Sequence, residues 1–63
     1  MEVNRFTQIV RMFAFYGFTE TPLNAREIDR LIKLNWSDDD IYAIGCDCAA
    51  GLRFNEALMY YPA

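Results

Sequence analysis

The sequence predicts an all-α fold of three to four short helices, forming a small helical bundle in which residues 1–63 make a single domain. Three observations predict this class: apolar residues recur at helical spacing near the N-terminus, two later stretches carry complete helix-start signals, and glycine or proline separates the periodic segments. A core of this size rarely supplies more than about 3–5 kcal/mol of net stability by itself. Because 54% of the residues are hydrophobic, we expect dimerisation to complete the bundle.

The first helix is expected from Glu2 to Tyr16, and Gly17 is suited to end it in a left-handed conformation. Its apolar side chains cover an arc of roughly 240°, far wider than the ~100° stripe that an ordinary surface helix buries. They are Val3, Phe6, Ile9, Val10, Met12, Phe13, Phe15 and Tyr16. Two interpretations stay open: a central helix enclosed by its own domain, or a helix that also contacts a second subunit.

The second helix begins with an unusually complete signal. Asn24 is a good N-cap, Glu27 is placed to complete a capping box, and Leu23 and Ile28 are spaced as a hydrophobic staple. The buried face is expected to consist of Ile28, Leu31 and Ile32. The outer face carries Arg26, Arg30 and Lys33, and Asp29 precedes Lys33 at the favourable spacing of four.

The third helix begins in the same way. Ser37 is the expected N-cap, Asp40 follows three residues later, and Trp36 and Ile41 form the staple. Asp38, Asp39 and Asp40 fill the first turn, where carboxylates interact favourably with the helix dipole. Capping explains this acidic run better than a metal site does, because a calcium loop spreads its ligands over a longer stretch with a glycine turn.

Beyond Gly45 the sequence allows two predictions. One is a single long helix from Asp38 to about Tyr60, which tolerates Gly45 and Gly51 at about 1 kcal/mol each. The other is a turn at Gly45-Cys46, with Asp47 as N-cap and a fourth helix from Cys48 to Tyr60. In both cases Phe54, Ala57, Leu58 and Tyr61 give the last stretch a buried face, and Pro62 stops it.

Catalytic and metal-binding chemistry have little support. The chain has no histidine, no serine or cysteine with a base beside it in sequence, and no glycine-rich phosphate loop. A structural zinc site lacks its usual four ligands, because Cys46 and Cys48 are the only cysteines. We expect a non-enzyme with free thiols, no catalytic residue, no cofactor, no metal and no small-molecule substrate.

The expected location is the cytoplasm. No apolar run approaches the roughly 18–20 residues of a membrane span. The first residues also lack the basic segment and unbroken apolar stretch of a signal peptide. We therefore expect no membrane partner.

Protein–protein contact is the leading functional prediction. Aromatic residues and methionine are enriched at interface cores, and the chain contains five phenylalanines, four tyrosines, three methionines and one tryptophan. The expected dimer or partner surface consists of Phe6, Met12, Phe13, Phe15, Met59, Tyr60 and Tyr61.

The alternative is a helix-turn-helix-like DNA-binding regulator. Residues 40–46 resemble the first helix and glycine turn of that motif. Its would-be reading helix, however, carries Asp47, Arg53 and Glu56, and residues 34–63 sum to −4 while residues 1–33 sum to +1. DNA affinity comes largely from Lys and Arg. A DNA role would therefore use the basic face of the second helix, formed by Arg26, Arg30 and Lys33.

Over its full length, from MEVNRFTQIVRMFAFYGF to NEALMYYPA, the chain resembles a small early protein of lambdoid bacteriophages. The resemblance is to the sixty-three-codon open reading frame between the exonuclease and excisionase genes. It rests on overall sequence and length and transfers no site residue. It implies a non-essential phage product, made early in the host cytoplasm, that influences the choice between lysis and lysogeny or host takeover. Some products of that region carry DNA-binding-like folds.

Overall fold

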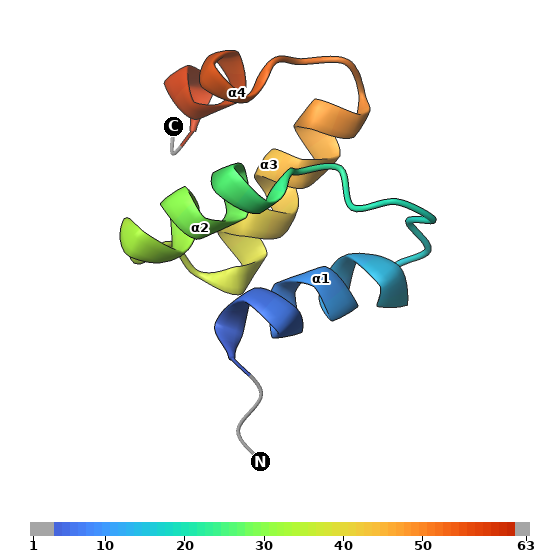
Figure 1. Ribbon diagram of the computed structural model, residues 1–63. Coiled ribbons are helices and arrows are strands. Elements are labelled where there is room, and N and C mark those ends of the chain that lie inside the picture. Colours follow the sequence, from blue (N-terminus) through green and yellow to red (C-terminus); the bar gives the residue numbers. More distant parts are fainter. Residues whose placement is uncertain (1–3, 62–63) are drawn as a thin grey trace.

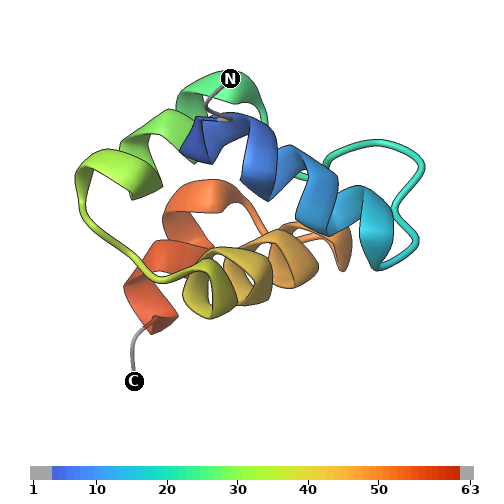
Figure 2. The ribbon, with the colours of Figure 1, turned by 90° about the horizontal axis from the view of Figure 1, so that it is seen from below.

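The computed structural model describes residues 4–61, which form four α-helices and no strand. They are α1 (Arg5–Phe15), α2 (Ala25–Lys33), α3 (Asp38–Ala49) and α4 (Phe54–Tyr60). Helix α1 packs on α2 and α3, and α4 packs on α3. Figure 1 places α1 and α4 on opposite sides of the molecule, and the loop between α1 and α2 projects outward in both Figure 1 and Figure 2. The predicted all-α class with three to four helices is confirmed.

The predicted helix starts at Asn24 and Ser37 are confirmed. Asn24 Oδ1 accepts from the backbone N–H of Glu27 at 2.8 Å, and the Glu27 carboxylate accepts from the backbone N–H of Asn24 at 2.9 Å. Ser37 Oγ accepts from the backbone N–H of Asp40 at 3.2 Å. Both devices satisfy backbone donors that the first turn of a helix leaves free.

The start of the first helix was predicted too early. Helix α1 begins at Arg5, because Asn4 has an extended backbone and its side chain caps the N–H of Thr7 at 2.8 Å. The predicted starting residue, Glu2, lies outside the described residues. At the other end Gly17 has φ +100°, so the predicted left-handed stop is confirmed.

The core is formed by apolar side chains from all four helices and from the residue that precedes the N-cap of α2. These fully buried residues are Ile9, Phe13, Leu23, Ile28, Leu31, Ile41, Ile44 and Ala57. Phe6, Val10, Met12, Ile32, Trp36, Phe54, Leu58 and Tyr61 are half-buried and pack against them. The apolar faces predicted for α2 and for the last helix are thus the faces that meet the core.

Each of the two predictions for the chain beyond Gly45 is right in one part and wrong in another. Helix α3 continues through Gly45 and ends at Ala49, so Gly45 is not a turn. The chain then reverses at Gly51, whose φ is +115°, and α4 begins only at Phe54, so there is no single long helix. The physical reason lies in α1: a Cβ on Gly45 would overlap the ring of Phe13. Glycine is needed here for close helix packing rather than for a turn. The predicted stop at Pro62 lies outside the described residues.

Candidate protein-interaction surface

The seven residues predicted to form one partner surface are divided by the fold. Phe15 and Met59 are each 84% exposed, and Tyr60 is also exposed. Phe6, Met12 and Tyr61 are half-buried against the core. Phe13 was assigned to this surface wrongly, because its side chain is fully buried between α1 and α3 and is not accessible to a partner.

The three exposed residues do not form one continuous patch. Phe15 ends α1, whereas Met59 and Tyr60 belong to α4, and these helices lie on opposite sides of the molecule in Figure 1. The side chains therefore contribute to two separate apolar surfaces. The wide arc of the first helix is explained in part by the domain itself, which buries Ile9 and Phe13 and leaves Phe15 outside.

The surface at the end of α1 is aromatic and is built on the core. We call Phe15, Tyr16 and Tyr42 the aromatic surface. The Phe15 and Tyr16 ring centroids are 5.4 Å apart in an edge-to-face arrangement, and those of Tyr16 and Tyr42 are 4.6 Å apart. The ring of Tyr42 in turn stacks on buried Phe13, at 5.8 Å between centroids. A continuous series of ring contacts thus joins the most exposed aromatic residue to the core.

Of this surface, the predicted partner residues include Phe15 alone. Tyr16 was placed only in the apolar arc of the first helix, and no role was predicted for Tyr42. It follows the buried Ile41, and nothing in its local pattern places it beside Tyr16, because that contact joins α3 to the end of α1. A hydrogen bond with the Cys46 thiol, followed by burial, raises the pKa of Tyr42 above 10.0. A tyrosine phenol is neutral at physiological pH, and an upward shift does not change this, so Tyr42 suits an apolar contact surface.

The C-terminal aromatic residue Tyr61 has a structural partner of its own. Its ring lies 5.6 Å from that of Trp36, and its hydroxyl donates a hydrogen bond to Asp40 Oδ1 at 2.9 Å. This hydrogen bond, with burial and the nearby carboxylates, raises the pKa of Tyr61 above 10.0. Tyr61 is therefore tied to the start of α3, which makes it a poor candidate for partner contact.

An ion pair and a hydrogen bond also connect the start of α1 to the start of α3. Arg5 Nη2 lies 3.0 Å from Asp38 Oδ1, and the same guanidinium donates to the carbonyl oxygen of Trp36. Two of the aspartates that the sequence assigned to helix capping thus have tertiary partners as well: Asp38 binds Arg5 and Asp40 binds Tyr61.

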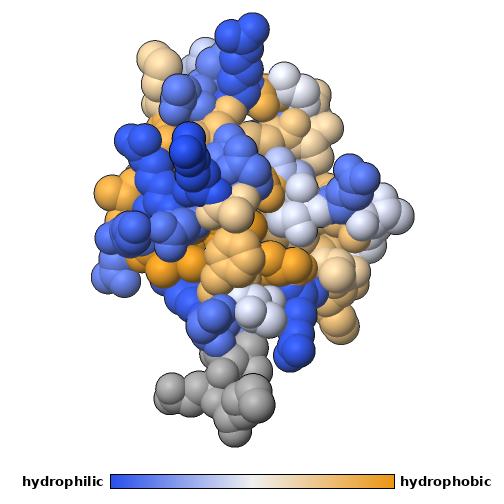
Figure 3. Space-filling model, viewed as in Figure 1, coloured by the Kyte–Doolittle hydropathy of each residue, from blue (hydrophilic) through white to orange (hydrophobic). Residues whose placement is uncertain are grey.

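The predicted basic face is present on α2. Arg26, Arg30 and Lys33 are all exposed, and Lys33 forms the predicted ion pair with Asp29 at 2.9 Å. They line a groove of about 510 Å³ between α2 and the start of α4, together with Glu27, Asp29, Leu34 and Phe54. Figure 3 shows hydrophilic surface over α2 interrupted by hydrophobic surface.

The predicted helix-turn-helix outline is not the one observed. Its glycine turn was placed at Gly45, which lies inside α3, and the connection to α4 comes after Ala49 instead. Helix α4 has seven residues, and Glu56 is its one charged side chain. The basic residues lie on α2, which is not part of the stretch that resembles a helix-turn-helix motif.

Cys46 and Cys48 are free and half-buried. Burial first, and then the charges of Glu27 and Asp47, raise the pKa of Cys48 above 9.0. Within residues 4–61, no three His, Cys, Asp or Glu side chains gather as a metal site would require. In the same part of the chain, no helix has the length and apolar character that a bilayer crossing needs.

Comparisons with protein-family models, with curated proteins and with solved structures find no significant match to this chain. We therefore infer the use of each surface from its own side chains.

Proposed function

We propose that this protein is a non-enzymatic phage early regulatory protein that acts in the host cytoplasm through protein–protein contact at the aromatic surface. The observation that carries the proposal is the exposure of two adjoining aromatic rings, with Phe15 84% and Tyr16 58% exposed. Large aromatic residues are frequent among the few side chains that dominate binding energy at protein interfaces.

The construction of the surface supports this use. Aromatic side chains offer a large contact area while having few rotatable bonds to immobilise. Tyr42 is held between Tyr16 and the buried Phe13, so part of the surface is ordered before a partner arrives. Ordering before binding lowers the entropy lost on association.

The phage setting rests on the full-length resemblance to the lambdoid early protein. The regulatory part of the proposal is an influence on the choice between lysis and lysogeny or on host takeover, exerted by binding a host or phage protein. A small product made early in infection would act in this way by occupying a surface of a larger protein.

The proposal includes a homodimer. Eight side chains form the fully buried core, and apolar residues on α1 and α4 remain exposed in the single chain. A second copy that covered such residues would add hydrophobic stabilisation of about 25 cal/mol per Å² of apolar area. Sedimentation velocity over a range of concentrations tests this part, and a monomer at the highest concentration would exclude it.

A matched pair of variants tests the partner contact. Phe15→Ser and Met59→Ser each remove an apolar side chain of equal exposure, from α1 and α4 respectively. We expect Phe15→Ser to lose the protein captured by the immobilised wild type from phage-infected host extract, and Met59→Ser to retain it. If Phe15→Ser captured the same protein as the wild type, the aromatic surface would be ruled out as the partner-binding site.

A second candidate function is DNA binding through the basic face of α2. The observation that favours it is the exposure of Arg26, Arg30 and Lys33 on one helix. A gel shift on phage early DNA at low salt, lost in Arg26→Glu/Arg30→Glu and weakened as salt rises, would support this function. No shift at low salt would remove it.

A further inference from the structure

We propose that the groove between α2 and the start of α4 is a second protein-docking site, which binds an acidic peptide segment carrying an apolar anchor side chain. The groove is separate from the aromatic surface. It has a volume of about 510 Å³, and its lining combines two apolar side chains with cations on α2.

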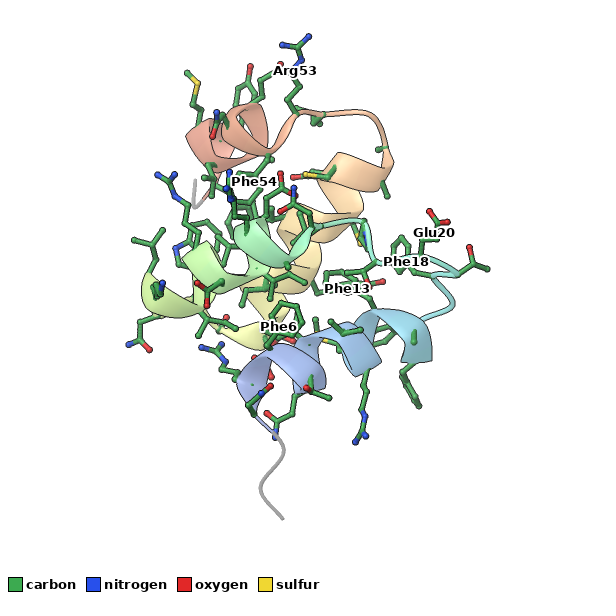
Figure 4. The ribbon with its side chains drawn as sticks, in the orientation of Figure 1. Phe6, Phe13, Phe18, Glu20, Arg53 and Phe54 are labelled. Carbon is green, nitrogen blue, oxygen red and sulfur yellow. The ribbon has the colours of Figure 1, made fainter. Side chains whose placement is uncertain are left out.

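The apolar part of the groove consists of Leu34 and Phe54. Leu34 is 53% exposed although it is a large aliphatic residue, and Phe54 is half-buried against the core. In Figure 4, Phe54 lies between the start of α4 and helix α2. An apolar side chain of a partner would cover both residues.

The position of Leu34 is set by the end of α2. It is the C-cap residue, and the next residue, Asn35, has φ +63°. The chain then returns so that the Trp36 N–H donates to the Leu31 carbonyl at 3.1 Å, which closes the helix end. Leu34 is thus presented to solvent by a fixed backbone rather than by a loose loop.

The charged part of the groove favours carboxylates. Arg26 and Arg30 are exposed, and neither has a carboxylate of residues 4–61 within ion-pair distance, whereas Lys33 is paired with Asp29. Residues four apart lie on the same side of a helix, about 6 Å apart along its axis. Two arginines on one side of a helix match carboxylates on a peptide, since planar guanidinium groups bind carboxylates through paired hydrogen bonds.

The mixed lining favours a peptide over nucleic acid. Glu27 and Asp29 also line the groove and would repel a phosphate backbone. Leu34 and Phe54 supply apolar contact, which sequence-independent phosphate binding does not require. A peptide with carboxylates on either side of one apolar residue satisfies both parts of the lining. The chain as a whole has a net charge of −3. The groove differs from it, because its lining has three basic and two acidic side chains.

Fluorescence anisotropy with synthetic peptides tests the proposal. The probe is a labelled pool rich in Glu and Asp with one Leu or Phe in each peptide, compared with a pool in which Gln and Asn replace the acids. We expect the acidic pool to bind the wild-type protein better, with affinity reduced about tenfold or more in Arg26→Glu/Arg30→Glu and also reduced in Leu34→Ser.

Controls separate the groove from the rest of the chain. Arg11→Glu changes an exposed arginine on α1 in the same way and should leave peptide binding intact, as should Phe15→Ser at the aromatic surface. If the charge-reversed protein misfolds, the milder Arg26→Gln/Arg30→Gln still tests the two arginines. Circular dichroism checks that each variant is helical.

Three results would overturn the proposal. In the first, the acidic pool binds no better than the neutral pool, or the arginine variants bind it unchanged. In the second, a labelled DNA duplex binds through Arg26 and Arg30 while neither peptide pool does. In the third, the same variants abolish self-association and no peptide competes, which would make a second copy the occupant.

Discussion

The ring of Phe13 lies against Gly45 so closely that a Cβ at position 45 would overlap two of its ring atoms, Cε1 and Cζ. This contact joins α1 to α3 at the centre of the core. The hypothetical Cβ would also lie 3.2 Å from Cγ of Pro22, in the loop before α2. The glycine is therefore enclosed from two directions and has little room to relax.

Gly45→Ala should destabilise the protein even though alanine is the better helix former. Overpacking a core typically costs about 1–3 kcal/mol, and the gain in helix propensity returns about 1 kcal/mol. Because the Cβ would overlap a buried ring, we expect a net loss of up to about 2 kcal/mol in the free energy of unfolding, measured by urea titration. Pairing the change with Phe13→Leu should recover part of the loss, because residues in contact are coupled. Strict additivity of the two changes would contradict the packing account.

Truncating Phe13 should greatly lower the stability of the protein, whereas truncating Phe15 should have little effect on it. Phe13→Ala removes a fully buried ring, which typically costs about 3–5 kcal/mol, as much as a domain of this size has available. We expect this variant to be largely unfolded by circular dichroism. At a concentration too low for dimerisation, Phe15→Ser should change the free energy of unfolding by no more than about 0.5 kcal/mol, because its side chain is exposed in the single chain. A large loss at that concentration would contradict the exposure of the ring.

The capping box of α2 gives a local test. Asn24→Ala removes the acceptor for the Glu27 N–H and should lower the free energy of unfolding by about 1 kcal/mol. Asn24→Asp keeps a side-chain acceptor and should differ from the wild type by a few tenths of a kcal/mol at most. Thermal and urea unfolding of the three proteins at one pH gives the comparison. Equal stability of Asn24→Ala and wild type would show that the box contributes nothing.

Stability should fall in alkaline solution, in part through Tyr61. Its pKa is raised in the folded protein, so above pH 10.0 the folded state holds the phenolic proton more tightly than the unfolded state does. The stabilisation is fully present below pH 10.0 and is lost as pH rises through the raised folded pKa. The pKa of Tyr42 is also raised in the folded protein, so its ionisation should contribute to the same alkaline decline in stability.

Replacing Tyr61 should therefore flatten this alkaline decline. Tyr61→Phe removes the titrating group, and Asp40→Asn removes the charged acceptor that helps to raise the pKa of Tyr61. The free energy of unfolding, measured by urea titration at several pH values from neutral to alkaline, should decline less steeply in both variants. A decline as steep as in the wild type would show that another group is responsible.

Cys48 should be a slow nucleophile near neutral pH. Its pKa is raised above 9.0, first by burial, and the thiolate is the reactive form. In Cys46→Ser, which leaves Cys48 as the single thiol, the rate of reaction with a thiol reagent should reach half of its maximum above pH 9.0. A half-maximal rate at or below that pH would contradict the shift.

The basic face of α2 could be predicted from the sequence, whereas the aromatic surface could be predicted only in part. Arg26, Arg30 and Lys33 were placed on one exposed face because they share a side of a single helix, and helical periodicity is a local property. Phe15 was identified together with Phe13, although only one of them is exposed. Periodicity describes a direction around the helix axis, and it does not say which neighbour lies there. Tyr42 was missed because its contacts come from α1.

The sequence by itself determined where α2 and α3 begin, because Asn24 and Ser37 bind backbone donors only three residues away. It likewise determined the left-handed stop at Gly17. Only the tertiary structure decided that Gly45 lies within a helix, since the reason for that glycine is the ring of Phe13 on another helix. Capping acts within one turn of the chain, whereas close packing depends on residues far apart in sequence that folding brings together.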